Sequence, residues 1–273
     1  PGDRLSRQIS GQARPVGLGR VLGSYAFALT ESGESAEGER VGREALQLGE
    51  VDPWGMHATL HAIEARGGLE EALEWLSQTD IHLASANNFR GHVYWHQAVI
   101  ASLLGRWEEA LALYDTKIAI YPAHDYRDLL NEVTLLHRFR RAGHAIGERA
   151  ERCAETARHR LGDHGSAFAD VHHVLSLLLA EHEEEAEAYV ESMRVHGRAT
   201  DGLEARILRE IAVPVSEAIC MTQRNPLGAE RTFASLSTSL PRLGGSRAQH
   251  AVFELLQDEI RRQRNPLSQG RPS

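Results

Sequence analysis

The sequence predicts an all-α protein, an α-solenoid of about six antiparallel helix pairs with a capping helix at its C-terminal end. Between Val16 and Val213, only Pro53 and Pro122 interrupt a stretch dominated by Ala, Leu, Glu and Arg, residue types that favour helices. The chain contains no run of alternating β-branched residues bounded by turn pairs, which is the pattern expected of strands. A repeated turn-and-helix phrase then gives the period of the array.

This phrase consists of a Gly turn, an acidic pair, an Ala, and an apolar residue four positions after that Ala. It begins at Gly67 and again at Gly105, an offset of 105 − 67 = 38 residues. Looser copies begin at Gly33 and at Glu181. The pattern is typical of tetratricopeptide repeats, helix-turn-helix units of about 34 residues. Because Ala is small, it suits the point where the two helices of a unit cross.

The predicted elements follow from these turns and from the prolines. The helix pairs cover 17–32 with 35–49, 54–66 with 69–79, 90–104 with 107–119, 127–142 with 145–160, 166–180 with 183–196, and 203–223 with 227–240. A last helix over about 245–262 caps the array. Gln-Arg-Asn-Pro-Leu occurs at 223–227 and again at 263–267, each time where Pro should end a helix. We therefore expect a polar lead over 1–16, one repeat domain over 17–262 and a tail over 263–273.

The composition argues against several classes of partner. Acidic side chains outnumber basic ones by 38 to 30 and are spread along the chain, so no basic surface for nucleic acid or an anionic membrane is expected. No apolar run approaches the ~20 residues that span a bilayer. Cys153 and Cys220 form no CxxC motif, which argues against a disulfide framework or a thiolate zinc site. These features favour a cytoplasmic protein.

The most informative polar residues lie on the first helices of the second and third pairs. His57, His61 and Glu64 are spaced four and three residues apart, so they share one stripe of a helix. His92 and His96 recur one repeat later, because 92 − 57 and 96 − 61 both equal 35. Adjacent helices lie about 8–10 Å apart. We expect these five side chains to converge on the inner, concave wall of the array.

Three interpretations of this group are open at the level of the sequence. The side chains can simply pack and hydrogen-bond between helices. A His pair at i and i+4 followed by a carboxylate can hold a divalent metal, or it can position a general acid and a general base. The pair lacks the HExxH order of zinc proteases. The sequence therefore specifies neither a metal nor a cofactor, and it makes these five residues candidates for catalysis.

Further polar and aromatic residues are expected to bind a ligand along the same wall. Two lie between His92 and His96. Two occupy the repeat positions of His61 and Glu64 on the first helix of the fourth pair, and two lie on the first helix of the fifth pair. They are Trp95, Tyr94, His137, Arg140, Asp170 and His172. His137 is expected to extend the histidine group, and Asp170 and His172 to extend the polar wall.

Several phrases in the sequence are similar to those of a known family. They are LGSYAFAL at 22–29, WGMHATLHAIE at 54–64, HVYWH at 92–96, YDTKI at 114–118 and GGSRAQHAVF at 244–253. Over about residues 17–260 the chain resembles the tetratricopeptide repeat protein 38 family. The last phrase departs from the family's GGSHAQRDVF, because Arg247 and His250 stand in place of His and Arg. The resemblance implies a repeat scaffold and no settled activity.

Two functions are compatible with these features. The first is a scaffold whose concave groove binds a peptide or a small molecule, with Trp95 and the histidines as anchors. The second is an enzyme that uses His57, His61 and Glu64 with His92 or His96 for acid-base or metal-assisted chemistry on a small molecule. A compact pocket lined by titratable groups would favour the enzyme. Homo-oligomerisation through an exposed helical face is compatible with either function.

Overall fold

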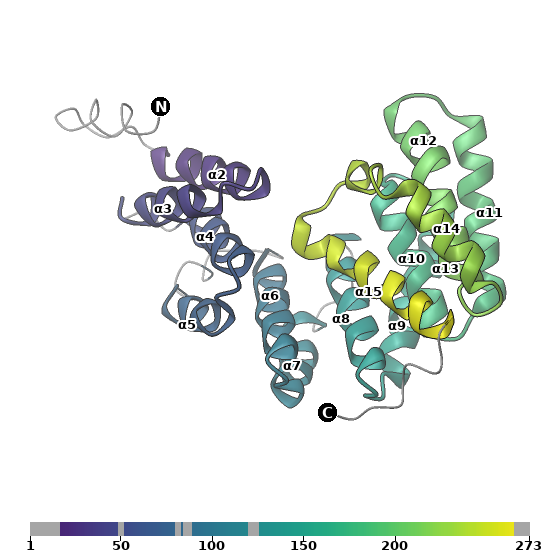
Figure 1. Ribbon diagram of the computed structural model, residues 1–273, viewed down its shortest axis with the longest axis horizontal. Helices are drawn as coiled ribbons and strands as arrows, with labels where there is room; N and C mark the ends of the chain where they lie inside the picture. The colour runs from purple at the N-terminus through teal and green to yellow at the C-terminus, as the bar shows by residue number, and fades with distance from the viewer. Residues whose placement is uncertain (1–16, 49–51, 80–82, 84–88, 120–125, 265–273) are drawn as a thin grey trace. The chain divides into compact units, whose positions relative to one another are not determined.

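The computed structural model describes residues 17–48, 52–79, 83, 89–119 and 126–264, and every regular element within these ranges is a helix (Figure 1). The predicted all-α class is therefore confirmed. The predicted lead over 1–16, Pro122 and the part of the tail after residue 264 lie outside the described residues. None of the described helices combines the length and the apolar character that crossing a membrane requires. The chain divides into two compact units, 1–105 and 106–273.

The first unit contains the first five predicted helices. They are α2 (Leu18–Glu31), α3 (Ser35–Leu46), α4 (Pro53–Ala65), α5 (Leu69–Thr79) and α6 (Phe89–Leu103). Pro53 occupies the first turn of α4, where its missing N–H costs nothing, and the Asp52 side chain caps this helix by accepting from the Trp54 N–H at 3.0 Å. These caps fix where α4 begins and so set the direction in which its side chains point.

Glycines allow α2, α3 and α4 to pack closely. A Cβ atom on Gly23 would lie 2.8 Å from the Gly55 backbone nitrogen, and one on Gly42 would lie 2.3 Å from Thr59 Oγ1. Real Cβ atoms essentially never lie within 3.0 Å of another such heavy atom. The small residues therefore bring both neighbouring helices against α4. Apolar side chains complete the core around it, among them Met56, Leu60, Ile63, Val93 and Ile100.

The second unit contains the remaining elements. They are α7 (Trp107–Leu113), a π turn (Tyr114–Ile118), α8 (Tyr126–Arg141), α9 (Gly147–His159), α10 (Ala167–Leu179), α11 (Glu183–Ala199), α12 (Leu203–Ile207), a second π turn (Leu208–Ala212), α13 (Val213–Met221), α14 (Pro226–Leu236), a 3-10 turn (Leu240–Leu243) and α15 (Arg247–Arg264). The predicted helices over 107–119 and 203–223 are thus continuous but contain π turns, which the sequence did not indicate.

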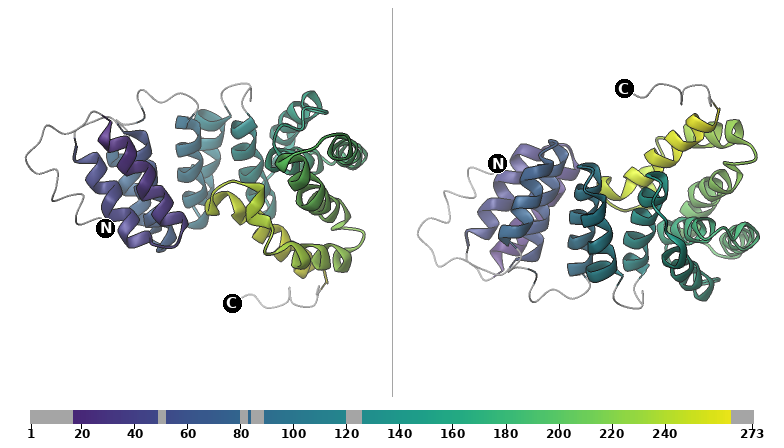
Figure 2. Two further views of the ribbon diagram at one scale, coloured as in Figure 1. Left: turned by 90° about the horizontal axis from the view of Figure 1, so that it is seen from above. Right: turned by 90° about the horizontal axis from the view of Figure 1, so that it is seen from below.

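Helix α10 is the centre of the second unit. Nearly all of its side chains are buried, because α8, α9, α11 and α13 all pack against it. Helix α15, yellow in Figures 1 and 2, packs against α14 and α8. In five of the predicted pairs, the two helices contact each other. These pairs are α2 with α3, α4 with α5, α8 with α9, α10 with α11 and α13 with α14. In the remaining predicted pair, α6 belongs to the first unit and α7 to the second.

The first helix of each of the first five pairs ends in the same way. A residue with positive φ follows two positions after the last helical residue, at Gly33, Gly67, Gly105 and Gly143 and, after α10, at Glu181. Gly adopts this left-handed conformation without a steric penalty. The conformation closes the helix and turns the chain into its partner. Glu181, with φ of 65°, adopts it in spite of its side chain.

Candidate metal centre

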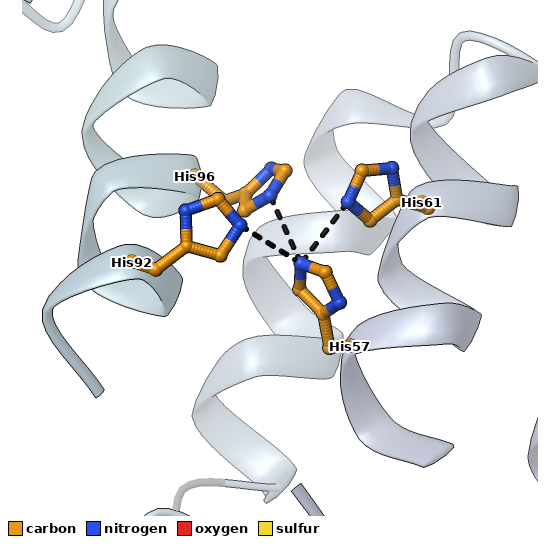
Figure 3. Close-up of side chains that lie close together, drawn as sticks. All are labelled: His57, His61, His92 and His96. Atoms are coloured by element: carbon orange, nitrogen blue, oxygen red, sulfur yellow. Dashed lines mark hydrogen bonds between the residues drawn. The ribbon is translucent and has the colours of Figure 1, made fainter. Parts of the chain in front are cut away.

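Four histidine side chains from two helices meet in the first unit (Figure 3). His57 and His61 come from α4, and His92 and His96 from α6. The Nε2 atom of His57 lies 3.0 Å from that of His61, 3.1 Å from that of His92 and 3.3 Å from that of His96. One ring nitrogen from each of the four lies within 4.8 Å of all the others. The structure thus brings together the four histidines that the repeat spacing placed on one wall.

The local sequence explains this convergence. In each helix the two histidines are one turn apart, so both project from the same side. Every residue of α4 from Gly55 to Ile63 is buried, and the two imidazoles of α4 meet those of α6 (Figure 3). His57, His61 and His96 are buried, and His92 is half-buried. His92 therefore marks the side on which the cluster is nearest to solvent.

Two carboxylates hold the outer nitrogens of the cluster. Glu64 on α4 lies 3.1 Å from His96 Nδ1, and Glu31 at the end of α2 lies 3.4 Å from His61 Nδ1. A carboxylate favours a proton on the nitrogen that it faces, so it leaves the Nε2 lone pair free to point inward. The sequence identified Glu64 but missed Glu31, which belongs to the preceding repeat and falls outside the histidine spacing.

Aromatic rings enclose the histidines. Phe27 stacks on His57 with ring centroids 5.8 Å apart, and Trp95 stacks on His92 at 5.3 Å. Phe89 and Trp54 contact His57 edge-on, at 5.1 and 5.7 Å. Trp95, which was predicted to bind a ligand, is buried and forms part of this wall. Tyr94 is half-buried, and its position two residues from both His92 and His96 directs it away from their side of the helix.

The environment keeps the central imidazoles neutral. Burial lowers the pKa of His57 well below its usual value, and the neighbouring His61, His92 and His96 lower it further. Burial likewise lowers the pKa of His96, with His61 adding to the effect and Glu31 opposing it. Neutral imidazole is the form that coordinates metals, because only it offers a lone pair. At neutral pH these two rings need not lose a proton before a metal binds.

Hydrogen bonding alone does not account for the contacts at His57 Nε2. A neutral imidazole nitrogen has either one N–H or one lone pair, whereas three other nitrogens lie within 3.3 Å of this atom. Zinc–nitrogen bonds of about 2.0–2.1 Å in a tetrahedral site place the ligand nitrogens about 3.3–3.4 Å apart. The observed separations from His57 Nε2 are close to this value. The arrangement is therefore suited to coordinating one metal ion.

The remaining predicted ligand residues lie in the second unit. His137 is buried, and its Nε2 lies 3.2 Å from Glu259 on α15. Burial lowers the pKa of His137, although the bond to Glu259 partly opposes the shift. His172 donates from Nδ1 to the Phe168 carbonyl at 2.8 Å, and burial lowers its pKa to about 4. Asp170, also buried, accepts hydrogen bonds from His164 and Tyr189.

A cavity of about 350 Å³ also lies in the second unit. Arg140, one of the predicted ligand residues, lines it together with Glu259, the partner of His137. The other lining residues are Leu175, Leu178, Glu181, Glu183, Ile219, Cys220, Thr222, Gln223 and Leu256. The sequence identified Arg140 from its repeat position but missed the contribution of α13 and α15, which come from later parts of the chain.

The sequence matches no model of a known protein family, and no solved structure matches the chain.

Proposed function

We propose that this chain is a helical-repeat protein of the tetratricopeptide kind that binds one divalent transition-metal ion through His57, His61, His92 and His96. The observation that carries the proposal is the convergence of three imidazole nitrogens on His57 Nε2 at 3.0 to 3.3 Å. The recurrent left-handed turns and the packed helix pairs support the repeat architecture, with α15 as its capping helix. The absence of any membrane-crossing helix among those described is compatible with a cytoplasmic location.

The donor set restricts the choice of metal. Four imidazoles suit zinc, copper, nickel, cobalt or iron, whereas magnesium and calcium require oxygen ligands. Glu64 and Glu31 face the outer nitrogens of His96 and His61. Carboxylates in this position orient the metal-bound histidines of known sites. Four protein ligands leave no position for a substrate in a tetrahedral complex, which is the pattern of a structural site. We therefore infer that the ion joins α4 to α6, and that catalysis at this centre would require one histidine to leave it.

Metal binding can be tested directly on the purified protein. Inductively coupled plasma mass spectrometry should find one equivalent of a transition metal after loading and buffer exchange. A cobalt-loaded sample should show the strong visible absorption of a tetrahedral complex. His57→Ala removes the nitrogen that contacts all three others, so it should lose the bound metal. His159→Ala is the matched control, since His159 is exposed on α9 and its Nδ1 bonds the Glu155 carbonyl of the same helix.

The proposal fails if the parent protein retains no metal after loading. It also fails if His57→Ala and His159→Ala retain the same amount as the parent. In either case, packing between helices would remain as the role of the histidines.

A second candidate function is supported by the cavity of the second unit. Its volume of about 350 Å³ is within the range that accommodates a small ligand. Arg140 and Glu259 on its wall offer charges of opposite sign. This supports the binding of a small polar molecule and fits the expectation that Arg140 contacts a ligand.

A further inference from the structure

A second polar constellation lies in the other unit and has no role in metal binding. His164 Nε2 lies 2.8 Å from Ser192 Oγ, and His164 Nδ1 lies 3.1 Å from Asp170 Oδ1. A hydroxyl, an imidazole and a carboxylate in this order are the arrangement that activates a serine nucleophile. We propose that Ser192, His164 and Asp170 form a catalytic triad that transfers the acyl group of small carboxylic esters to water.

The surrounding hydrogen bonds set the tautomer that a triad needs. Asp170 Oδ1 also accepts from the Tyr189 hydroxyl at 3.0 Å, and His173 Nδ1 lies 2.7 Å from the same hydroxyl oxygen. Burial raises the pKa of Asp170, but the hydrogen bond from His164 and the nearby His173 outweigh it, so the carboxyl stays below its usual pKa. An ionised Asp170 keeps the His164 proton on Nδ1. The Nε2 lone pair is then free to accept the Ser192 proton.

The backbone holds His164 in an unusual conformation. Its φ of 41° lies in the left-handed region, although it is not a glycine. Non-glycine residues in this region occur at functional sites more often than elsewhere, because the surrounding structure must hold them there. The imidazole is buried, whereas Ser192 is half-buried. The base is thus fixed and shielded, while the hydroxyl that would attack remains within reach of a substrate.

The chemistry follows from these positions. Ser192 Oγ attacks the ester carbonyl carbon as its proton passes to His164 Nε2. The bond between the carbonyl carbon and the ester oxygen then breaks, and the alcohol leaves with that proton. Water, deprotonated by His164, attacks the acyl-serine and releases the carboxylic acid and the free serine. Val195, one turn after Ser192 on α11, is an exposed apolar side chain that an apolar acyl group can contact.

An active-site-directed probe gives the sharpest test. A fluorophosphonate reacts with an activated serine when Oγ bonds to phosphorus and fluoride leaves. Peptide mass spectrometry of the native protein should find this label on Ser192, and Ser192→Ala should abolish it. His164→Gln should slow labelling by at least about tenfold, because the general base is lost. Hydrolysis of p-nitrophenyl acetate should fall in the same two variants.

Ser235→Ala serves as the control for both assays. Ser235 is an exposed helical serine that donates to the Thr232 carbonyl of its own helix, so its loss should change neither labelling nor hydrolysis. The proposal is overturned if Ser192 in the native parent labels no faster than Ser235. It is equally overturned if His164→Gln, shown to be helical by circular dichroism, labels at the parental rate. If that variant does not fold, the labelling of Ser192 in the parent decides the question alone.

Discussion

The four histidines of the proposed metal centre show how much of a site can be predicted from residue type and spacing. The i, i+4 spacing and the 35-residue offset were enough to predict that His57, His61, His92 and His96 would meet. Glu31 was not predictable, because its contact with His61 depends on how closely α2 approaches α4. That approach depends on Gly23 and Gly55. Side-chain type and spacing therefore indicate the ligands, whereas their outer partners depend on packing between repeats.

Glu132 is a buried carboxyl of α8 in the second unit. It accepts a hydrogen bond from the Tyr114 hydroxyl at 2.9 Å and lies 3.8 Å from the Cys153 thiol. Burial raises its pKa to about 7, although Tyr114 and the cation of Arg152 oppose the shift. Its folded-state pKa thus exceeds its unfolded value. The contribution of Glu132 to the free energy of unfolding is therefore fully present below about pH 4.5, the usual Glu value, and it is lost as the pH rises through 7.

We predict that Glu132→Gln makes the protein less sensitive to this change in pH. Gln keeps an oxygen that can accept from Tyr114 but carries no charge. A shift of about 2.5 pKa units at 1.36 kcal/mol each corresponds to about 3 kcal/mol. As the pH rises from 4.5 to 8, the free energy of unfolding of the parent should therefore fall by up to that amount more than the free energy of unfolding of the variant.

Urea denaturation at the two pH values measures this difference. Glu155→Gln, which removes an exposed carboxylate from α9 of the same unit, is the matched control for the loss of one charge. Parallel pH dependence in Glu132→Gln and the parent would contradict the prediction.

At the scale of elements, the repeat phrase predicted helices and turns well. Each predicted helix is found within a few residues of its expected bounds, because Gly at the end of a helix and Pro at its start act locally. The π turns at Tyr114–Ile118 and Leu208–Ala212 were not predicted. A π turn adds a residue to a helical turn without changing composition. In the first of them Tyr114 is buried and bonded to Glu132, a tertiary contact that periodicity does not reveal.

The turn after α10 gives a prediction about element stability. Glu181 adopts a φ of 65° where the other four turns have Gly, and this conformation costs a non-glycine residue about 1 kcal/mol. Glu181→Gly should therefore raise the unfolding free energy by up to about 1 kcal/mol. Gly105→Ala, the reverse change at an equivalent turn, should lower it by a similar amount. Chemical denaturation of both variants measures the two effects, and a destabilised Glu181→Gly would show that the Glu181 side chain contributes more than its backbone strain costs.

At the scale of the whole molecule, the chain divides into two compact units. The repeat phrase at Gly105 has the same form as the one at Gly67, so the sequence gives no sign that a compact unit ends there. The proposed metal site lies in the first unit, whereas the cavity and the proposed triad belong to the second. The two units should therefore respond differently to the same ligand.

Metal-linked stability makes this difference measurable. A ligand at 100 times its dissociation constant stabilises the folded state by about 2.7 kcal/mol. In a Trp107→Phe variant, all remaining tryptophans (Trp54, Trp75 and Trp95) belong to the first unit. Zinc should raise the unfolding temperature reported by their fluorescence, and a chelator should reverse the shift. His57→Ala should show no shift, and an equal increase in that variant would argue against the histidine centre as the cause.

The two carboxylates behind the histidines also determine the charge of the loaded centre. Four neutral imidazoles contribute none, while Glu31 and Glu64, when ionised, contribute two negative charges next to the buried rings. A divalent ion brings this group to neutrality, whereas a monovalent or trivalent ion leaves a net charge in a setting walled by aromatic rings. Burying an uncompensated charge is costly. The centre should therefore hold its ion in the divalent state and resist one-electron oxidation or reduction.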